Sequence, residues 1–552
     1  MTRRPLAVGA VVAVLAIVGG AAVIGAPGSI GAALGPPRFV DETATAGLDH
    51  TYGGSSTFTV GGGLAVLDCD ADGRPDLFVA GGANRAALYR NDGPTAGALH
   101  LERMPSPATD LTRVIGAYPV DIDGDGIVDL AVLRIGENVL LRGLGGCRFE
   151  RANEQFGFAG GEAMTTAFSA TWEASSELPT LAIGNYLRLD EAGESTFGCV
   201  DNELVRPIVG GSGYGRPLAL RPGFCALSML FTDWNGTGRR DLRVSNDRHY
   251  YDNAIGAEQL WRIEPGTEPR PYSAADGWTE VQVEGMGIAS QDLTGDGLPE
   301  VYLTSQGANR LQELTAGAER PTYGDIGLKR GVNASRPYTG DDTELPSTAW
   351  HPEFADVNND TFMDLFVSKG NLGGQPDFAI DDPPNLLIGR ADGTFGEGAM
   401  EAGIVTFAGG RGAALVDLNV DGLLDLVQVN FGRPVEVWRN VGSGDAAAPR
   451  KLGSWLAVRV TDPGRPNRDA IGGRLEVRVG GTIQSRDLTV GGGHASGQLG
   501  PIHLGLGTAT AADVRVRWPD GTVGPWQHTD ADRFVELVRD ADGLRTWTPP
   551  GA

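Results

Sequence analysis

One acidic pattern recurs six times along this chain of 552 residues, with the residue types and spacing of a calcium-binding loop. In its complete form the pattern reads Asp-x-Asp-x-Asp-Gly-x-x-Asp. Calcium takes roughly six to eight hard oxygen ligands, and alternate acidic side chains along a tight loop can all turn inward to supply them. In every copy the last carboxylate follows the first by eight residues, a regularity that chance does not produce six times.

The nine positions of each copy have separate expected roles. Positions 1, 3 and 5 are expected to supply side-chain oxygens, position 7 its backbone carbonyl, and position 9 the carboxylate that closes the site. The loops are numbered 1, 2, 4, 5, 6 and 7, after the repeat units that carry them. Their predicted ligands, in that order, are Asp68, Asp70, Asp72, Arg74, Asp76; Asp121, Asp123, Asp125, Ile127, Asp129; Asp233, Asn235, Thr237, Arg239, Asp241; Asp292, Thr294, Asp296, Leu298, Glu300; Asp356, Asn358, Asp360, Phe362, Asp364; and Asp417, Asn419, Asp421, Leu423, Asp425.

The loops are not equivalent. Loops 1 and 2 have four carboxylates each, loops 5, 6 and 7 have three, and loop 4 has two, which predicts that loop 4 binds most weakly. Gly at position 6 permits the left-handed backbone of a sharp turn, and its replacement by Thr361 in loop 6 predicts strain there. Up to six Ca²⁺ would bring the formal charge from −25 to −13, so calcium is expected to be a structural component.

The spacing of the loops predicts a repeat architecture. First positions lie 53, 112, 59, 64 and 61 residues apart, and 112 is about two periods, which implies a third unit that has lost its motif. In that unit Trp172, Ala174, Ser176 and Thr180 occupy the ligand positions, so it should bind no ion. Each motif lies between short apolar segments, with about four expected strands to a unit. We therefore predict an all-β chain with a seven-bladed β-propeller over residues 38–445.

Two insertions interrupt the repeat, at about 188–225 and 305–348, and are expected to carry specificity because binding residues concentrate on loops of a rigid scaffold. A Gly/Asp/Ala/Pro-rich stretch at 442–449 marks a linker. Alternating apolar residues at 456–460, 474–479 and 514–518 then predict a small β-sandwich domain over 446–552.

A family resemblance joins these two parts. The motifs at 467–472 (Asn-Arg-Asp-Ala-Ile-Gly), 491–494 (Gly-Gly-Gly-His), 503–507 and 516–521 resemble the ASPIC/UnbV domain. The preceding repeats resemble VCBS/FG-GAP calcium-binding propellers, which accompany that domain in proteins similar to cartilage acidic protein. The resemblance covers about residues 39–545. It implies an extracytoplasmic calcium-binding propeller with metal loops similar to those of the integrin α-subunit head, and it implies no reaction.

The N-terminus and the cysteines indicate export. Arg3 and Arg4 precede a stretch without charge that extends to residue 37, so residues 1–37 are expected to be a signal peptide or an N-terminal membrane anchor. Both place the protein outside the cytoplasm, secreted or anchored. Four cysteines permit two disulfides: Cys199 with Cys225 is favoured by proximity, whereas Cys69 with Cys147 follows by elimination, with free buried thiols as an open alternative.

The most consistent function is binding of an extracellular protein or glycan, without catalysis. The acidic composition makes nucleic acid a poor partner. The alternative is a calcium-dependent hydrolase of glycans or phosphoesters, with its site in the insertions near Tyr214, Asp247, His249 and Tyr250. A polar site at His494 and His503, near Arg468 and Asp469, is conceivable, although structural turn histidines are more common. Trp438 and Trp518 are expected in the core.

Overall fold

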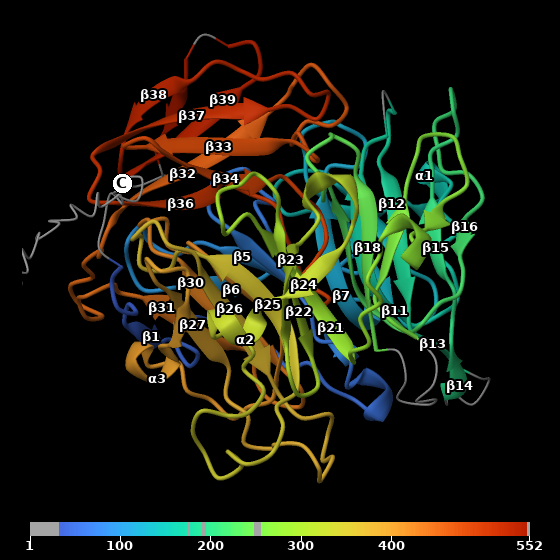
Figure 1. The fold of residues 1–552 in the computed structure, drawn as a ribbon, viewed down its shortest axis with the longest axis horizontal. Coiled ribbons are helices and arrows are strands. Elements are labelled where there is room, and N and C mark those ends of the chain that lie inside the picture. The colour runs from blue at the N-terminus through green and yellow to red at the C-terminus, as the bar shows by residue number, and fades with distance from the viewer. Residues whose placement is uncertain (1–32, 174–175, 190–194, 248–255, 542, 549–552) are drawn as a thin grey trace, which may run out of the picture.

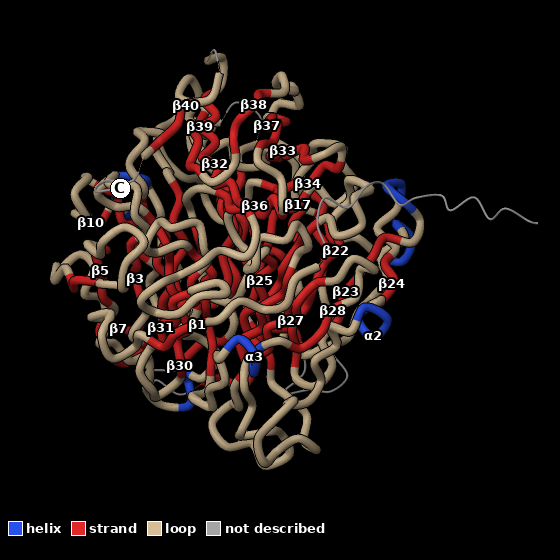
Figure 2. Tube along the Cα trace, turned by 90° about the vertical axis from the view of Figure 1, so that its left-hand side faces the viewer, coloured by secondary structure: helices blue, strands red, loops and turns tan. Residues whose placement is uncertain are grey.

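The computed structural model describes residues 33–173, 176–189, 195–247, 256–541 and 543–548. The predicted signal peptide or anchor at 1–37 lies almost wholly outside these ranges. Within them, no helix has both the length and the apolar character needed to cross a bilayer. The described chain is built from short strands, with helices of a single turn (Figures 1 and 2). The all-β prediction is therefore confirmed.

Seven sheets follow one another along residues 39–440, and we number them 1 to 7. Each contains four strands paired antiparallel with their neighbours, with additions noted below. Sheets 1 to 4 contain β2 (Leu64–Leu67), β3 (Asp76–Val79), β5 (Ala87–Asn91) and β6 (Leu101–Arg103); β7 (Thr112–Val120), β8 (Asp129–Arg134), β9 (Val139–Gly143) and β10 (Phe149–Arg151), with β4 (Gly82–Arg85) beside β7; β11 (Thr165–Thr171), β12 (Thr180–Asn185), β15 (Asn202–Val205) and β16 (Leu218–Leu220); and β17 (Ala226–Thr232), β18 (Asp241–Asn246), β19 (Gln259–Arg262) and β20 (Arg270–Pro271).

Sheets 5 to 7 contain β21 (Gly285–Gln291), β22 (Glu300–Ser305), β23 (Arg310–Leu314) and β24 (Tyr323–Asp325); β25 (Ala349–Ala355), β26 (Asp364–Lys369), β27 (Asn385–Gly389) and β28 (Phe395–Glu397); and β29 (Gly410–Val416), β30 (Asp425–Asn430), β31 (Glu436–Asn440) and β1 (Phe39–Asp41). A separate hairpin pairs β13 (Leu187–Leu189) with β14 (Ser195–Cys199). The helices are α1 (Asn153–Phe156), α2 (Gly327–Arg330) and α3 (Ala399–Ala402), with 3₁₀ turns at Ser56–Phe58, Ala274–Asp276 and Gly317–Glu319.

Sheet 7 joins the two ends of this region. The N-terminal strand β1 pairs antiparallel with β31, with Phe39 opposite Asn440. The first strands of the seven sheets also contact one another in chain order, and β29 contacts β2 again. The seven first strands thus form a closed cycle, which leaves none of them as an exposed sheet edge.

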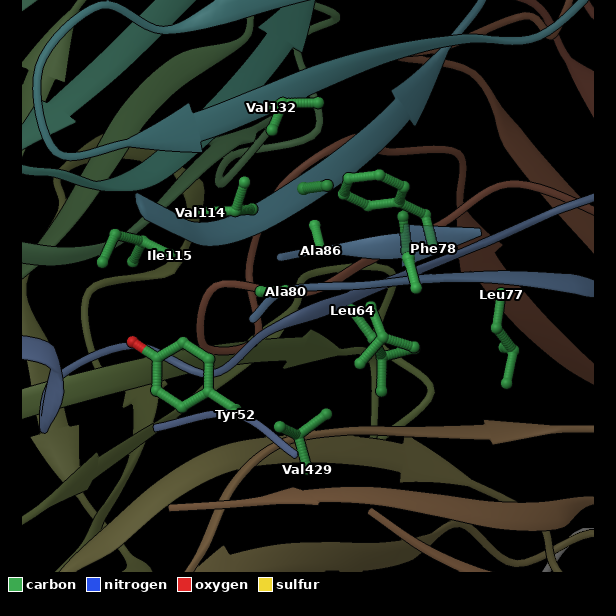
Figure 3. Packing of buried hydrophobic residues seen from close by; sticks show 14 of the residues in the cluster. Tyr52, Leu64, Leu77, Phe78, Ala80, Ala86, Val114, Ile115, Val132 and Val429 are labelled. Atoms are coloured by element: carbon green, nitrogen blue, oxygen red, sulfur yellow. The ribbon is translucent and has the colours of Figure 1, made fainter. Parts of the chain in front are cut away.

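The first strands are buried along almost their whole length, polar residues included. Between sheets 1, 2 and 7, side chains such as Leu64, Phe78, Val114 and Val429 meet in one hydrophobic cluster (Figure 3). All four are fully buried. Trp438 packs in a similar cluster and is 3% exposed, and Trp518 is 5% exposed, so both are core residues as predicted.

Two further four-stranded sheets follow at the C-terminal end and lie on one side of the others (Figure 1). Sheet 8 contains β36 (Ile502–Gly507), β32 (Ser454–Thr461), β39 (Arg533–Val538) and β40 (Arg545–Trp547). Sheet 9 contains β34 (Thr482–Asp487), β33 (Arg474–Val479), β37 (Ala511–Arg517) and β38 (Gln527–Asp530). Residues of both sheets, including Leu456, Val477 and Val514, share one hydrophobic core.

A glycine-rich segment at 490–498 leaves these C-terminal sheets and inserts among the first strands. It forms bridges from Val490 to Ala170, from Gly491 to Leu230 and from Ser496 to Ala117, and β35 (Gly497–Gln498) pairs parallel with β2. The approach is so close that a Cβ added at Gly63 would lie 1.8 Å from the carbonyl oxygen of Ala495. The C-terminal sheets are therefore tied into the cycle of first strands.

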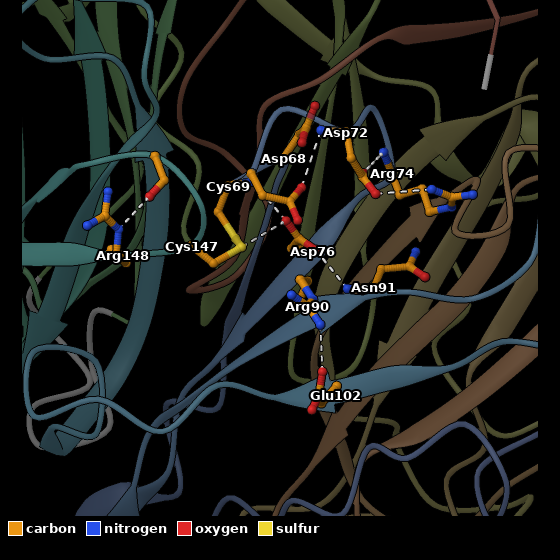
Figure 4. The surroundings of a disulfide bond; sticks show 12 residues. Asp68, Cys69, Asp72, Arg74, Asp76, Arg90, Asn91, Glu102, Cys147 and Arg148 are labelled. Atoms are coloured by element: carbon orange, nitrogen blue, oxygen red, sulfur yellow. Dashed lines mark hydrogen bonds and ion pairs between the residues drawn. A yellow bond between two sulfur atoms is a disulfide. The ribbon is translucent and has the colours of Figure 1, made fainter. Parts of the chain in front are cut away.

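Both predicted disulfides are present. Cys199–Cys225 joins β14 to the start of sheet 4, and Cys69–Cys147 joins loop 1 to the turn after β9 (Figure 4). The alternative of free thiols at Cys69 and Cys147 is wrong, since the two cysteines lie close enough to bond, with Cα atoms 4.6 Å apart.

Candidate metal centres

The six acidic loops occupy equivalent places in six sheets. Each connects the first strand of its sheet to the second, and the residue at position 9 is the first residue of the second strand. Position 6 has φ between 82° and 87° in all six loops. Five loops have glycine there, whereas Thr361 adopts φ 82° despite its branched Cβ. The predicted left-handed turn and the strained position in loop 6 are therefore found in the structure.

Position 4 is a second left-handed position that the sequence reading missed. Its φ is 50–76° in all six loops, at Ala71, Gly124, Gly236, Gly295, Asn359 and Val420. A signal was present, since three of the six are glycine and one is asparagine, the residues that most readily take this conformation. The two left-handed positions, 4 and 6, curl the loop so that its alternate side chains face inward.

A shared hydrogen bond holds this curl. In each loop the backbone N–H of position 6 donates to Oδ2 of the position 1 aspartate, over 2.7–3.1 Å. The donor and acceptor pairs are Gly73 with Asp68, Gly126 with Asp121, Gly238 with Asp233, Gly297 with Asp292, Thr361 with Asp356, and Gly422 with Asp417. Position 1 is thus fixed by one oxygen. Its other oxygen accepts no hydrogen bond in loops 1 and 2, whereas in loops 4 to 7 it accepts a second backbone N–H of the same loop.

Position 9 has a structural role that its expected ligand role did not reveal. In loop 1, Oδ2 of Asp76 accepts from Cys69 N at 2.8 Å and Oδ1 accepts from Asn91 N at 2.8 Å (Figure 4). Asp129, Asp364 and Asp425 accept from the equivalent backbone groups. The carboxylate therefore ties its loop to the third strand, and each oxygen keeps a second lone pair for a metal.

Loops 1 and 2 bring three carboxylates together. One oxygen each of Asp68, Asp70 and Asp76 lie within 4.8 Å of one another, and the same holds for Asp121, Asp123 and Asp129. Among the described residues the other four loops show no such group of three acids, because their position 3 is Asn or Thr. Asp76 also lies near Cys69 and Cys147, but those sulfurs form a disulfide and offer no thiolate.

Unpartnered oxygens indicate that a cation fits these loops. Oδ1 of Asp68, Oδ1 of Asp121 and Oδ1 of Asn419 are buried and accept no hydrogen bond. Burial raises the pKa of Asp68 to about 6 and that of Asp121 to about 7. Buried carboxylates without a compensating charge are unfavourable, and a hard divalent cation would compensate them.

Arginines already pair with carboxylates in three of the loops. In loop 1, Arg74 lies 3.0 Å from Oδ2 of Asp72. In loop 4, Nε of Arg239 lies 3.0 Å from Oδ1 of Asp241, and Trp234 Nε1 and Tyr272 Oη donate to Oδ2 of the same carboxylate. In loop 2, Arg142 pairs with Asp123 and Asp125, at 2.6 Å each. Arg142 pairs with positions 3 and 5 of loop 2, whereas Arg239 pairs with the position 9 carboxylate of loop 4.

The third sheet carries no acidic loop, as expected. Trp172 is 7% exposed in a hydrophobic cluster, and Ala174 lies outside the described residues. Thr180 Oγ1 donates to Glu173, which also pairs with Arg206 at 2.7 Å. Glu173, which lies between the first two strands of this sheet, is therefore held by partners within the chain.

The C-terminal sheets cover the loop face. Arg474 donates to the carbonyl of Gly297 in loop 5 at 2.6 Å, and Arg240, next to position 7 of loop 4, donates to the carbonyl of Gly472 at 2.6 Å. In loop 6, the side-chain oxygen Oδ1 of Asn359 lies 2.6 Å from Nε2 of His503. The backbone carbonyl of Asn359 accepts from Gly507 N at 2.8 Å.

The other three loops are also in contact with these sheets. A Cβ added at Gly73 of loop 1 would lie 1.9 Å from the ring of Trp547, and one at Gly422 of loop 7 would lie 1.9 Å from the ring of Trp455. A Cβ at Gly126 of loop 2 would lie 3.0 Å from Nε of Arg468. All six loops therefore lie at the boundary between the seven sheets and the C-terminal sheets.

The two histidines proposed for a polar site do not share one. His494 is fully buried among the first strands beside Trp350, with ring centroids 5.0 Å apart, and His503 lies at loop 6 against Trp455. Burial lowers the pKa of each to about 3, which keeps both rings neutral.

Of the residues suggested for a hydrolase site, two are described. Tyr214 is 4% exposed and packs in a hydrophobic cluster with Phe158. Asp247 is 3% exposed and accepts from Tyr186 Oη at 2.6 Å. His249 and Tyr250 lie outside the described residues.

Two family models match the chain. One describes an FG-GAP-like repeat and matches residues 68–132, which span loops 1 and 2, and the other describes ASPIC and UnbV and matches residues 463–543. The resemblance drawn from the motifs is therefore confirmed. Together these segments indicate an extracellular-type β-propeller recognition or adhesion module, and the disulfides are typical of that environment. No curated protein matches the chain.

Similar solved structures are distant. An Agrocybe aegerita lectin that recognises non-reducing terminal N-acetylglucosamine is 15% identical with a TM-score of 0.39, and the match covers 70% of this chain and 97% of the lectin. BBS1N in complex with ARL6DN is 10% identical with a TM-score of 0.40 over 75% and 99%. A hypothetical selenium-binding protein from Sulfolobus tokodaii is 12% identical with a TM-score of 0.37 over 61% and 79%.

Proposed function

We propose that this protein is an exported calcium-binding recognition module. In this proposal the seven sheets are the blades of a seven-bladed β-propeller closed by β1, and sheets 8 and 9 form a β-sandwich fixed on the propeller. Residues 1–37 serve as a signal peptide or a membrane anchor. The partner is an extracellular protein or a glycan.

The repeated loop geometry is the observation that supports calcium most directly. Six loops share the hydrogen bond from position 6 to position 1 and two left-handed backbone positions. Loops 1 and 2 add an unpartnered aspartate oxygen beside three gathered carboxylates. Simple acidic turns in solvent have no need of this inward arrangement, whereas a calcium site requires it.

We propose calcium in five loops, with loop 4 occupied weakly if at all. The guanidinium of Arg239 lies on the position 9 carboxylate of loop 4 and supplies positive charge where calcium would. The other loops have three or four carboxylates and retain their predicted ligands. Bound calcium would supply positive charge and extra ligand bonds, and the chain's own residues would hold the loops in register with the third strands.

The same ions would strengthen the contact with the C-terminal sheets. Loops 1, 5, 6 and 7 support Trp547, Arg474, His503 and Trp455 directly. A loop stiffened by calcium presents a fixed surface to those side chains. Removal of calcium should therefore loosen the C-terminal sheets as well as the loops.

Partner recognition is proposed at the insertions. The β13–β14 hairpin of the first insertion, which Cys199–Cys225 ties to the start of sheet 4, lies on the opposite side of the molecule from sheets 8 and 9 (Figure 1). This leaves the hairpin face free of the C-terminal sheets that cover the metal loops.

The test is a glycan array and a pull-down from extracellular material, performed with the protein in calcium and after chelation. A matched variant should lack residues 190–194, which lie between β13 and β14 in the sequence, while it keeps both cysteines. Calcium-dependent binding that this variant loses would support the proposal. Retention of full binding by the variant would place recognition elsewhere.

A further inference from the structure

A cavity of about 380 Å³ lies between the loop face and sheet 8. Its volume is within the range of small-molecule sites, roughly 300–1,000 Å³. Neither the motifs nor the family matches assign it a role. One wall comes from loops 1 and 7 with the first strands β2, β25 and β29. The other comes from β32, β36, β39 and β40 of sheet 8, the segment before β36, and Arg486 of β34 in sheet 9.

The walls are mainly apolar. Phe354 and Leu415 face the cavity from the first strands, and Phe534 and Trp547 face it from sheet 8. Phe534 and Trp547 pack edge to face with ring centroids 5.1 Å apart. A flat apolar group could therefore contact aromatic rings from sheet 8 and aliphatic side chains from the first strands.

Two arginines interrupt this apolar lining. The guanidinium of Arg486 donates to the carbonyl of Ser485 at 2.9 Å and contacts the sulfur of Met363. Within the described part of the chain, no carboxylate lies within 4.0 Å of it, and none lies within that distance of Arg459. Arginines that line a cavity without a carboxylate partner are suited to bind an anion.

The carboxylates of the same cavity have other partners. Glu353 accepts from Leu415 N at 3.0 Å and from Gln498 at 2.8 Å. Glu536 accepts from Thr461 and faces Arg545. Asp68 and Asp417 belong to loops 1 and 7. Here the inference rests on the proposed function, because calcium bound in those loops would neutralise the two carboxylates. With loops 5 and 6 loaded as well, the carboxylates that face Arg486, Asp292 and Asp356, would hold calcium, and Arg459 keeps the buried Asp469 as an electrostatic neighbour.

We propose that this cavity binds a small amphipathic carboxylic acid. Its carboxylate lies between Arg459 and Arg486, and its apolar body, aromatic or aliphatic, lies against Phe354, Leu415, Phe534 and Trp547. The ligand then bridges the loop face and sheet 8, and binding stabilises their contact.

The test uses 1-naphthoate as the probe and the neutral 1-naphthalenemethanol as its matched control, by calorimetry on the full-length protein in millimolar calcium. We expect one naphthoate per chain and affinity at least about tenfold above that of the alcohol, as for a charge-assisted hydrogen bond. Arg486→Gln and Arg459→Gln should each weaken naphthoate binding about tenfold. Arg517→Gln, which changes an arginine outside the cavity lining, should leave it unchanged.

Arg459 is exposed, so Arg459→Gln should fold even if Arg486→Gln does not. Ala457→Leu, which fills the cavity, should abolish binding of both probes at an unchanged melting temperature. Absence of saturable naphthoate binding, equal affinity for the alcohol, or full affinity in both arginine variants would overturn the proposal. Calcium content measured on the same sample separates the two proposals: calcium without naphthoate binding refutes only the cavity, and naphthoate binding without calcium refutes only the calcium sites.

Discussion

The guanidinium of Arg239 lies on the buried carboxylate of Asp241, with Nε 3.0 Å from Oδ1. Asp241 is fully buried and closes loop 4, the loop with the fewest acids. The chain itself therefore supplies the positive charge there, which distinguishes loop 4 from the five loops that are proposed to bind calcium.

This difference predicts unequal effects of matched substitutions at position 1. Asp121→Asn in loop 2 should remove one calcium per chain, because the amide keeps the hydrogen bond from Gly126 N but loses a charge. Asp233→Asn in loop 4 should leave the calcium content unchanged. Metal analysis after gel filtration at micromolar free calcium measures both. An equal loss from the two variants would show that Arg239 does not replace calcium.

The strained backbone at Thr361 predicts that glycine at this position would stabilise the folded protein. Its φ of 82° is unfavourable for a residue branched at Cβ, so Thr361→Gly should raise the free energy of unfolding by about 1 kcal/mol. Gly422 occupies the same position in loop 7 and lies against Trp455, so Gly422→Ala should lower it by about 2 kcal/mol. Chemical denaturation in calcium measures both. Destabilisation by Thr361→Gly would mean that the threonine side chain makes a contact worth more than the strain.

Glu258 predicts a pH dependence that is independent of the metal loops. It is 1% exposed, and burial raises its pKa to about 7, above the ordinary value of 4.5. The pKa of Glu258 is raised in the folded state, so the folded protein keeps the proton more readily than the unfolded chain. The contribution of Glu258 to stability is therefore complete below pH 4.5 and is lost as the pH rises through 7.

Glu258→Gln should therefore flatten the stability profile. The contribution of Glu258 falls by about 2 kcal/mol between pH 5 and pH 8, and the variant should lack that part of the slope. Glutamine can still accept from Asn246 N, as Glu258 does at 3.0 Å. Denaturation at a series of pH values in excess calcium is the measurement. Parallel profiles for the two proteins would refute the assignment.

The close packing of the inserted segment 490–498 predicts that Gly63, the residue before β2, does not tolerate a side chain. Gly63→Ala should lower the free energy of unfolding by about 3 kcal/mol, because the new Cβ would meet the carbonyl of Ala495 at 1.8 Å. Gly500→Ala is the matched control, since a Cβ there meets nothing within 4 Å, and it should change stability by less than about 0.5 kcal/mol. Tolerance of Gly63→Ala would mean that the segment can leave its place without loss.

Sequence reasoning located the loops because their ligands are local: Asp68 to Asp76 span nine residues, and a curled loop needs few other contacts. It also found the strain at Thr361 for the same reason. It missed the backbone bonds of Asp76, because Asn91 is brought near by sheet pairing. The burial of His494 and the contact of Trp455 with Gly422 depend on how the C-terminal sheets sit on the loops, which no local pattern encodes.

Calcium content combined with thermal unfolding tests the central proposal most directly. Protein purified in calcium and freed of unbound ions should retain about five Ca²⁺ per chain, and excess EDTA should lower its melting temperature by 10 °C or more, on the order expected when several site ligands lose their ion. Protein that retains no calcium and melts at the same temperature with and without EDTA would contradict the account.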